Sequence, residues 1–295
     1  MNVSIVIPTY YRIKDLSELF NSILKQTVKP LEVIVVDDTP TSAIEELCEA
    51  YRCAFKRCNI KLVYVKNYRG QSAAIARNVG ASIARGEVIL FLDSDVILHP
   101  TYIEKILEVF NIKKGALGAQ GWILLKVRQK DLYLWNPLHK FFSLLYLSKN
   151  SCKLFEYPYV LTRIINCEYL SGANMAYRRE VFDKLGLKFD ENLKGYSYME
   201  DLLFSHTLYK MFPKSLYITP YAKLIHKWSK EGRTEKLSGL LLETQHMLSC
   251  KKYVLMKLFG VRGLIYFSRQ YFGLLFFGIL RRVAQKLKVS IHKNA

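Results

Sequence analysis

Residues 88–95 read Val-Ile-Leu-Phe-Leu-Asp-Ser-Asp, an uncharged apolar run that ends in two carboxylates one residue apart. Such a run is typical of a strand buried on both faces, as in a parallel sheet. Asp93 and Asp95 repel each other at a partly dry strand end, so they need a counter-charge. A hard divalent cation supplies one, although a solvated turn rich in Asp gives the same sequence.

The strand at 88–92 is the last of a regular alternation over the first 125 residues. Apolar β-type runs lie at 3–7, 31–36, 62–65 and 88–92, and helical spacing lies between them at 13–24, 43–54 and 73–84. This alternation indicates an α/β fold with a Rossmann-like, mostly parallel sheet flanked by helices. Ligands of such sheets bind beyond the carboxyl ends of the strands. We therefore expect residues 8–10, 37–38 and 93–95 at one edge.

A second feature that suits a phosphate precedes the helical run at 73–84. Arg69-Gly70-Gln71 leads into this run, and Arg77 lies near its start. Free backbone N–H groups and the helix dipole favour a phosphate or a nucleotide there. A plain helix start has the same composition, so this feature is less specific than the paired carboxylates.

The charge of the chain is strongly basic. Its 295 residues are 51% hydrophobic, and 44 Lys and Arg against 25 Asp and Glu give a net charge of +19. Such a balance suggests an anionic partner, which is a nucleic acid, a membrane surface or a phosphorylated substrate. The six cysteines form no C-x-x-C pair and no zinc-like spacing, so we expect buried, reduced thiols.

The N-terminal sequence contains no basic region followed by a long apolar stretch, and the chain contains no run of about 20 apolar residues. We expect neither a secretory signal nor a spanning helix. The expected location is the cytoplasm, with peripheral contact at the inner face of the membrane.

Four motifs in register give the first ~100 residues a specific resemblance. They are Val-Ser-Ile-Val-Ile-Pro-Thr-Tyr at 3–10, Val-Val-Asp-Asp at 35–38, Ala-Arg-Asn-Val-Gly at 76–80 with Gly70 before it, and Phe-Leu-Asp-Ser-Asp at 91–95. Together they resemble the family 2 glycosyltransferases, which are inverting enzymes with the GT-A fold. The likeness continues more loosely to about residue 228, through residues 171–174, Glu200-Asp201 and His226.

The resemblance implies a role for each matching residue. The nucleotide-sugar site would consist of Pro8, Tyr10, Asp38, Gly70, Arg77 and Asp93, with Arg77 beside Asp38 at the nucleobase. Mn²⁺ or Mg²⁺ would bind Asp95, Asp93 and His226, and Asp201 would be the general base. Gly172, Ala173, Asn174 and Glu200 would lie on the acceptor side. The resemblance favours a UDP-sugar over a GDP-sugar as the donor. The acceptor would be a glycan or a lipid-linked hydroxyl.

Each role has an ordinary alternative, and the family pattern is incomplete. Asp201 suits a helix N-terminus by charge alone, and His226 suits a packed histidine. Tyr11 stands where a small polar residue is usual, Thr39-Pro40 replaces a Gly-Ser or Asn-Ser pair, and His206-Thr207 occupy the place of a basic residue. These departures bear on the donor and the acceptor, and they leave the fold unchanged.

The last fifty residues differ in character from the rest of the chain. From Thr244 onward there are ten basic residues and no acidic one, and they alternate with Leu, Phe and Tyr at helical spacing. Such a helix suits an anionic bilayer surface, whereas packing on the catalytic domain or on a second subunit is the alternative. We expect a catalytic domain at 1–230, divided into a nucleotide-sugar half at 1–110 and an acceptor half at 111–230. A basic amphipathic helical tail follows at 244–290.

Three other functions compete with glycosyl transfer. A nucleotidyltransferase shares the acidic metal ligands but carries a glycine-rich motif with a catalytic Lys or Arg after the first strand. This chain has Pro-Thr-Tyr-Tyr-Arg at 8–12 instead, which argues against that function. A nucleic-acid-binding module suits the net charge, but the predicted ligand edge is acidic, so we expect no nucleic-acid partner. A catalytically inactive scaffold is the third, although Asp95 and Asp201 are both present.

Overall fold

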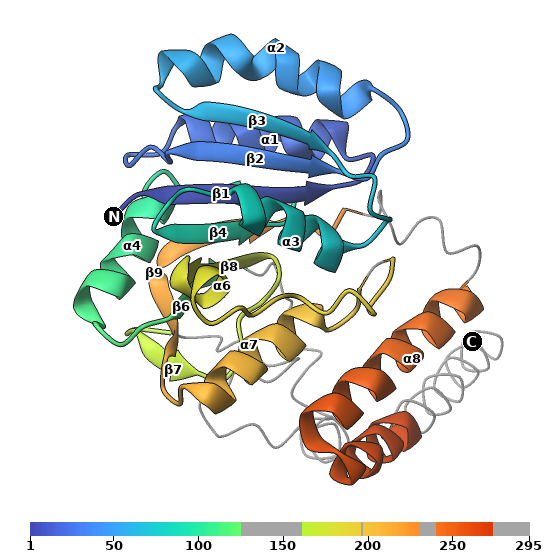
Figure 1. The fold of residues 1–295 in the computed structure, drawn as a ribbon. Helices are drawn as coiled ribbons and strands as arrows, with labels where there is room; N and C mark the ends of the chain where they lie inside the picture. The colour runs from blue at the N-terminus through green and yellow to red at the C-terminus, as the bar shows by residue number, and fades with distance from the viewer. Residues whose placement is uncertain (125–160, 196, 230–239, 274–295) are drawn as a thin grey trace, which may run out of the picture.

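The computed structural model describes residues 1–124, 161–195, 197–229 and 240–273, and these form one mixed sheet with helices on both faces (Figure 1). The strands are β1 (Val3–Thr9), β2 (Glu32–Asp37), β3 (Lys61–Lys66), β4 (Val88–Leu92), β5 (Val96–Leu98), β6 (Gly118–Ile123), β7 (Ile165–Cys167), β8 (Asn174–Arg178) and β9 (Leu216–His226). The helices are α1 (Ile13–Leu24), α2 (Ala43–Arg57), α3 (Ala73–Ile83), α4 (Tyr102–Ile112), α6 (Glu180–Asp183), α7 (Glu200–Met211) and α8 (Leu240–Phe259). The strand order is β3-β2-β1-β4-β8-β6-β9-β5, and β7 pairs with β9.

The first half of the sheet is parallel, as its apolar runs predict. β1 lies between β2 and β4, β2 pairs with β3, and all three pairings are parallel. Every residue of β1, β2 and β4 is buried, because helices cover both faces. The predicted strands and helices of this half are confirmed, with small shifts at their ends.

The second half of the sheet is mixed rather than parallel. β8 runs antiparallel to both β4 and β6, and β9 is antiparallel to β5 but parallel to β6. The sequence of β8, Asn-Met-Ala-Tyr-Arg, has little β-branched character, and its position between two buried strands makes it a strand. The sheet is therefore parallel from β3 through β2 and β1 to β4, as expected, and it is mixed from β4 to β5, where β6 and β9 are again parallel.

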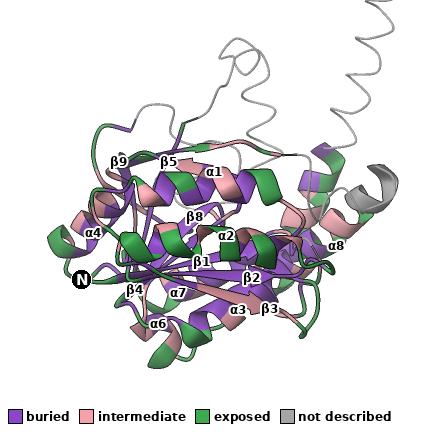
Figure 2. Cartoon of the chain, turned by 90° about the horizontal axis from the view of Figure 1, so that it is seen from above, coloured by how far each residue is buried: buried purple, intermediate pink, exposed green. Residues whose placement is uncertain are grey.

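Two apolar cores lie on the two faces of the sheet, and Figure 2 shows that β1 and β2 between them are buried. Helices α1, α2 and α4 cover one face, and α3, α6, α7 and α8 cover the other. Helix α3 approaches β1 closely, since a Cβ atom at Gly80 would lie 2.2 Å from Cγ1 of Val6. Glycine at this position lets α3 lie low on the sheet, and this contact sets the height of Arg77 above β4.

The tail is helical where the structure describes it. Helix α8 begins at Leu240, four residues before the expected boundary, and a further helix follows over 261–273. Val254, Leu255 and Leu258 of α8 are buried in the core that contains α7. Among the described residues, no helix has the length and apolar character to cross a membrane. The basic residues from Arg281 onward, and most of the aromatic segment between 121 and 165, lie outside the described residues.

The expectation of buried cysteines holds for only some of those that the structure describes. Cys48, Cys167 and Cys250 are buried, whereas Cys53 is exposed. Residues 53 and 48 both lie on α2, so the spacing of five puts them on different faces of that helix.

Candidate active site

The carboxyl ends of β1 and β2 meet, as the alternation of strands and helices predicts. Thr9 pairs with Asp37, and the backbone N–H of Asp38 donates to the carbonyl of Thr9 at 3.1 Å. The two acids then differ. Asp37 is fully buried and accepts hydrogen bonds from the N–H of Thr39 at 2.7 Å and the hydroxyl of Tyr64 at 3.0 Å, so it holds the end of β2.

Asp38 is tied to the loop before α3 through Asn67, which the sequence interpretation did not single out. The Asn67 side-chain amide donates to Oδ1 of Asp38 at 2.6 Å and to the carbonyl of Gly70 at 2.9 Å. Gly70 has φ 121°, a conformation that L side chains rarely adopt. These bonds bring two of the expected nucleotide-binding residues together.

The other expected residues of the nucleobase side lie at the end of β1. Pro8 and Tyr10 are buried, and the rings of Tyr10 and Tyr11 meet edge-on with their centroids 4.7 Å apart. Tyr11 has φ 61°, a left-handed conformation at the point where the chain turns from β1 into α1. This turn sends the next side chain, Arg12, toward the end of β4.

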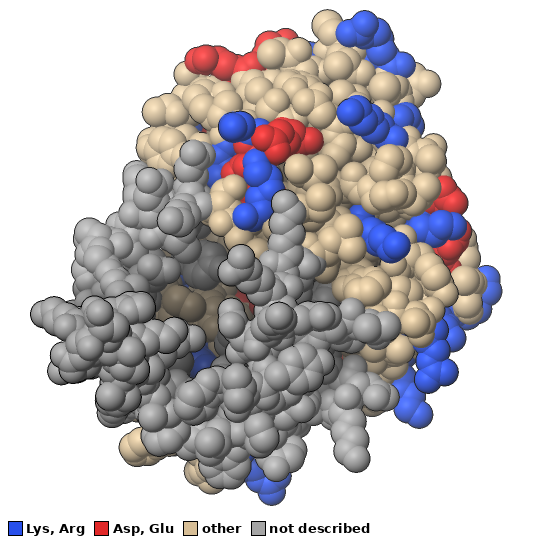
Figure 3. Space-filling view, turned by 180° about the vertical axis from the view of Figure 1, so that it is seen from behind, with Lys and Arg blue, Asp and Glu red and all other residues tan. Residues whose placement is uncertain are grey.

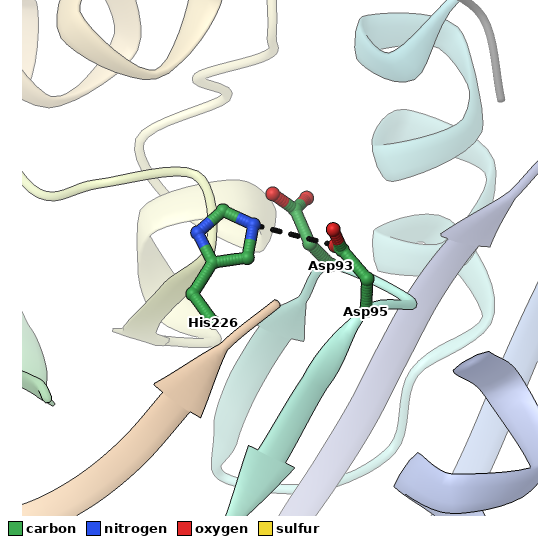
Figure 4. A group of neighbouring side chains, drawn as sticks. All are labelled: Asp93, Asp95 and His226. Atoms are coloured by element: carbon green, nitrogen blue, oxygen red, sulfur yellow. Dashed lines mark ion pairs between the residues drawn. The ribbon is translucent and has the colours of Figure 1, made fainter. Parts of the chain in front are cut away.

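Three potential metal ligands converge after β4 and β9. One ligand atom each of Asp93, Asp95 and His226 lies within 4.8 Å of the others (Figure 4). His226 comes from the end of β9, where it pairs with Val96 of β5, and its Nε2 lies 3.3 Å from Oδ1 of Asp95. Two carboxylates and an imidazole are a donor set that suits a divalent ion such as Mn²⁺. The buried Asp95 and the half-exposed Asp93 leave this group open on one side.

Asp95 has a further cationic partner that the sequence interpretation missed. Nη1 of Arg12 lies 2.6 Å from Oδ1 of Asp95, and the N–H of Ser229 donates to Oδ2 at 3.0 Å. Burial alone would raise the pKa of the Asp95 carboxyl, but His226 and Arg12 outweigh it and hold that pKa below its usual value. The signal available in the sequence was a basic residue at the end of β1, next to an edge expected to be acidic.

Arg77 joins the nucleotide half of the fold to α7. Its buried guanidinium donates to Oδ1 of Asp93 at 2.9 Å, to the carbonyl of Gly172 at 3.2 Å, and to the buried carboxylate of Glu200. Burial would lower the Arg77 pKa, but Glu200 and then Asp93 raise it above its ordinary value. Arg77 was expected beside Asp38, and these three hydrogen bonds place it between Asp93 and Glu200 instead.

Asp201, the expected general base, is held by backbone groups. Its Oδ2 accepts from the N–H of Gly172 at 2.7 Å, and its Oδ1 accepts from the N–H of Leu202 at 2.8 Å. Removal from solvent raises the pKa of the Asp201 carboxyl above its ordinary value, although these two N–H groups oppose the rise. A raised pKa suits a carboxylate that must accept a proton.

The small residues at 171–174 serve two different purposes. Gly172 contacts Asp201 and Arg77, and the carbonyl of Ala173 accepts from the N–H of Asp93 at 3.2 Å. Asn174 is fully buried, and its Oδ1 accepts from the Tyr102 hydroxyl at 3.0 Å and the Gly121 N–H at 2.8 Å. Asn174 therefore fastens β8 to its neighbours, a structural role beyond the expected place on the acceptor side.

The charge on one face of the described surface is dispersed. On the face drawn in Figure 3, Lys and Arg side chains are spread over the molecule between neutral residues, with a few acidic groups among them. Basic stripes that follow a nucleic-acid backbone are concentrated on one face or along one helix. The visible face has no such stripe in the part of the chain that the structure describes.

Comparison with known proteins identifies the family of the chain. Residues 4–186 match the family model described as glycosyl transferase family 2. The chain is 38% identical over 104 residues to the glycosyltransferase GlyG of Streptococcus pneumoniae serotype 4, a match that covers 35% of this chain and 33% of GlyG. It is 36% identical over 198 residues to YwdF of Bacillus subtilis, named an uncharacterized glycosyltransferase, and this match covers 66% of the chain and 65% of YwdF.

Solved structures share the fold at low sequence identity. The structure of Staphylococcus aureus TarS 1-349 in complex with UDP-GlcNAc matches with a TM-score of 0.59 at 19% identity, covering 92% of this chain and 72% of that one. GalNAc-T7 with UDP, GalNAc and Mn²⁺ matches with a TM-score of 0.58 at 19% identity, covering 77% of this chain and 44% of that one. The fold is therefore that of the GT-A glycosyltransferases.

Proposed function

The chain belongs to glycosyl transferase family 2, and we propose that it transfers a sugar from a UDP-sugar to an acceptor hydroxyl with inversion at the anomeric carbon. It is a glycosyltransferase by family and by fold. This membership sets aside the nucleotidyltransferase and nucleic-acid-binding alternatives. Its first two curated relatives match over 33% and 34% of their own lengths, so the donor, the acceptor and the stereochemistry are proposals for this chain.

The observation that carries the proposal is the connection between Asp93 and Asp201. Gly172 donates to Asp201 and accepts from Arg77, and Arg77 in turn donates to Asp93. The candidate metal ligands and the candidate base are thus joined by one residue and one buried cation. A donor held at one end and an acceptor held at the other would meet between them, which is the arrangement that a displacement reaction requires.

For the donor, we propose that the nucleobase lies at Pro8, Tyr10 and Asp38, and that the diphosphate lies toward Asp93 and Asp95. Structures of TarS contain UDP and UDP-GlcNAc, which supports uridine over guanosine. Asn67 and Gly70 border this region, because the Asn67 amide donates both to Asp38 and to the carbonyl of Gly70.

We propose that a divalent cation, Mn²⁺ or Mg²⁺, binds Asp93, Asp95 and His226. The donor set suits it, and the GalNAc-T7 structure contains Mn²⁺ beside UDP. Such an ion would neutralise the diphosphate as it leaves, acting as a Lewis acid. Without a cation, the carboxylates of Asp93 and Asp95 would repel the diphosphate.

We propose that Asp201 takes the proton from the acceptor hydroxyl as its oxygen attacks the anomeric carbon. The bond between that carbon and the diphosphate oxygen breaks in the same displacement, which inverts the configuration. General-base assistance of this kind is worth roughly 10²–10⁴-fold in rate. The Gly172 and Leu202 N–H groups support this role because they fix both carboxylate oxygens in place.

We further propose that 1–230 is the catalytic unit, with its nucleotide half at 1–110, and that the basic tail contacts an anionic membrane surface. Val261, Ile265 and Phe272 are 79%, 65% and 64% exposed at spacings of four and seven along the helix at 261–273, beside the exposed Arg262. An outward apolar stripe with basic neighbours suits an anionic bilayer. A lipid-linked acceptor would be consistent with that location.

The membrane proposal is tested by flotation with vesicles of neutral lipid and of neutral lipid plus phosphatidylserine. Binding to the anionic vesicles is expected for the full chain, and Ile265→Asp is expected to reduce it severalfold. Ile112→Asp is the matched control, because Ile112 is 61% exposed on α4, away from the tail. The proposal is contradicted if Ile265→Asp and Ile112→Asp bind the anionic vesicles equally, or if the full chain binds neither kind of vesicle.

The catalytic proposal is tested by thermal unfolding with a panel of nucleoside diphosphates and nucleotide sugars, with and without Mn²⁺. A rise in melting temperature with UDP and with one UDP-sugar, dependent on Mn²⁺ and absent in Asp95→Ala, is the expected result. Asp183→Ala, which removes an exposed carboxylate on α6, is the control. A shift with GDP alone corrects the base, and a shift that Mn²⁺ does not affect contradicts the metal assignment.

A further inference from the structure

Arg12 forms an ion pair with Asp95, one of the carboxylates that are proposed to bind the metal. Nη1 of Arg12 lies 2.6 Å from Oδ1 of Asp95, and Nε2 of His226 lies 3.3 Å from the same oxygen. Asp95 is 1% exposed and Arg12 is 18% exposed, so the pair is largely removed from water. In that environment a carboxylate requires a cation, and Arg12 is the permanently charged group on this oxygen.

The position of Arg12 is fixed from both sides. It precedes the first residue of α1 and follows Tyr11, whose left-handed conformation turns the chain out of β1. Its second terminal nitrogen, Nη2, donates to the carbonyl of Ser229 at 3.0 Å, and the N–H of Ser229 donates to Oδ2 of Asp95 at 3.0 Å. Arg12, Asp95 and Ser229 therefore form a closed ring of one ion pair and two hydrogen bonds.

The segment 227–229 is part of the same assembly. The N–H of Lys227 donates to the carbonyl of Asp95 at 3.0 Å, and the Lys227 ammonium contacts Glu18 of α1 at 2.9 Å. Between them, Trp228 has φ 50° and packs on His226 with the ring centroids 4.7 Å apart. The segment that follows the last proposed ligand is thus anchored to Asp95 through the backbone carbonyl, which Lys227 contacts, and through the carboxylate, which Ser229 contacts.

A divalent ion and a guanidinium compete for one carboxylate oxygen. Two cations that share an oxygen repel each other strongly in a water-poor site. A metal coordinated to Asp95 as well as to Asp93 and His226 would lie where the three ligand atoms converge, and Oδ1 of Asp95 is the atom that both Arg12 and His226 face. The contact between Arg12 and Asp95 must therefore weaken when the metal binds.

We propose that Arg12 is a built-in counter-ion of Asp95 that a divalent cation displaces, so that Arg12 sets the metal affinity of the site and couples metal binding to the segment 227–229. The inference rests on the proposed metal site at Asp93, Asp95 and His226. In the metal-free protein Arg12 relieves the repulsion between Asp93 and Asp95 and keeps the strand end folded. Binding of the metal exchanges one cation for another, and Arg12 lowers the affinity by the strength of the contact that is lost.

The test is a titration of the full chain with Mn²⁺ in the absence of nucleotide, with free Mn²⁺ measured by electron paramagnetic resonance. Arg12→Ala is expected to tighten Mn²⁺ binding about tenfold, because the ion pair between Arg12 and Asp95 no longer has to be broken. Arg12→Gln keeps most of the side-chain volume and is expected to tighten binding in the same direction, so the proposal stays testable if the alanine variant folds poorly. Lys14→Ala removes one exposed positive charge from the same end of α1 and is expected to change the affinity less than twofold.

The outcomes separate failure of the Arg12 inference from failure of the proposed metal site. Unchanged or weaker Mn²⁺ binding in both Arg12 variants overturns the inference, and so does equal tightening in Lys14→Ala, since that would be a general effect of net charge. Asp95→Ala separates this failure from failure of the metal site itself. If Asp95→Ala binds Mn²⁺ as the unaltered chain does, the metal site and the inference are both wrong. If Asp95→Ala abolishes binding while the Arg12 variants leave it unchanged, only the role of Arg12 is wrong.

Discussion

The backbone nitrogen of Gly172 lies 2.7 Å from Oδ2 of Asp201, while the carbonyl oxygen of the same glycine accepts a hydrogen bond from Arg77 at 3.2 Å. One residue without a side chain thus contacts the candidate base and the buried cation at once. A Cβ atom at position 172 would lie 3.2 Å from Nη2 of Arg77 and 3.3 Å from Oδ2 of Asp201. Both contacts are tighter than ordinary van der Waals distance, so a small residue here is a geometric requirement.

Gly172→Ala should therefore lower turnover more than it lowers stability. The added methyl group would push the Asp201 carboxylate a few tenths of an ångström away from the position fixed by the Gly172 N–H. Misplacing a catalytic group in an aligned site costs on the order of tenfold or more in kcat. Steady-state kinetics and urea unfolding measure the two effects. Gly115→Ala is the control, because nothing lies within 4 Å of a Cβ atom there. Equal kcat values in the two variants would show that the position of Asp201 is not critical.

Asp201→Asn should leave donor binding intact and reduce transfer by about 10²–10⁴-fold. The amide is nearly isosteric with the carboxylate but cannot accept the proton of the acceptor hydroxyl. Isothermal titration with the nucleotide measures the first effect, and product formation measures the second. Full turnover by Asp201→Asn would show that another group is the base.

Glu200→Gln should destabilise the fold, because it leaves the buried Arg77 guanidinium with less negative charge. The side chains of Arg77 and Glu200 are 3% and 6% exposed, and breaking a buried ion pair costs about 3 kcal/mol or more. Glu49→Gln provides the comparison, since the Arg52–Glu49 pair is 54% and 65% exposed and an exposed pair contributes about 1 kcal/mol or less. Urea unfolding of both variants checks the difference. Similar losses in the two would mean that Arg77 is balanced by Asp93 alone.

The attachment of α8 should weaken in acid through Asp190. Its carboxylate accepts hydrogen bonds from Lys257 and from the hydroxyl of Tyr253, both on α8. Burial would raise the pKa of Asp190, but the bond from Lys257 and the other donors outweigh it and lower that pKa below its ordinary value. Because the folded-state pKa is depressed, the contribution is complete above the unfolded value of about 4 and is lost as the pH falls through the folded value.

Urea unfolding of the unaltered chain and of Asp190→Asn between about pH 3 and pH 7 measures this contribution. The difference in unfolding free energy between the two proteins should shrink as the pH falls below about 4. Asp183→Asn serves as a control, because that carboxylate is half exposed and pairs with Arg179 within α6. A difference that stays constant with pH would show that the charge of Asp190 does not hold α8.

Local patterns in the sequence predicted the parallel half of the fold well. The runs at 3–7, 31–36 and 88–92 are buried strands because helices cover both faces of the sheet. A strand buried on both faces has a nearly continuous run of apolar residues, which is visible in the sequence. The antiparallel strand β8 has no such apolar run. Its residues, Asn-Met-Ala-Tyr-Arg, include no β-branched side chain, and Asn174 is buried there because Tyr102 and Gly121 satisfy its amide oxygen.

Local sequence patterns encode the alternation of strands and helices, the acidic residues that follow β4, and the four motifs that mark the family. Which of these residues meet depends on the packing of the whole chain. Arg12 reaches Asp95, and Arg77 lies between Asp93 and Glu200, because the turn at Tyr11 and the close approach of α3 to β1 direct them there. Apolar periodicity is a property of neighbouring residues and is readable along the chain. The pairing of buried charges depends on strand register and helix height, which arise only when the whole sheet has packed.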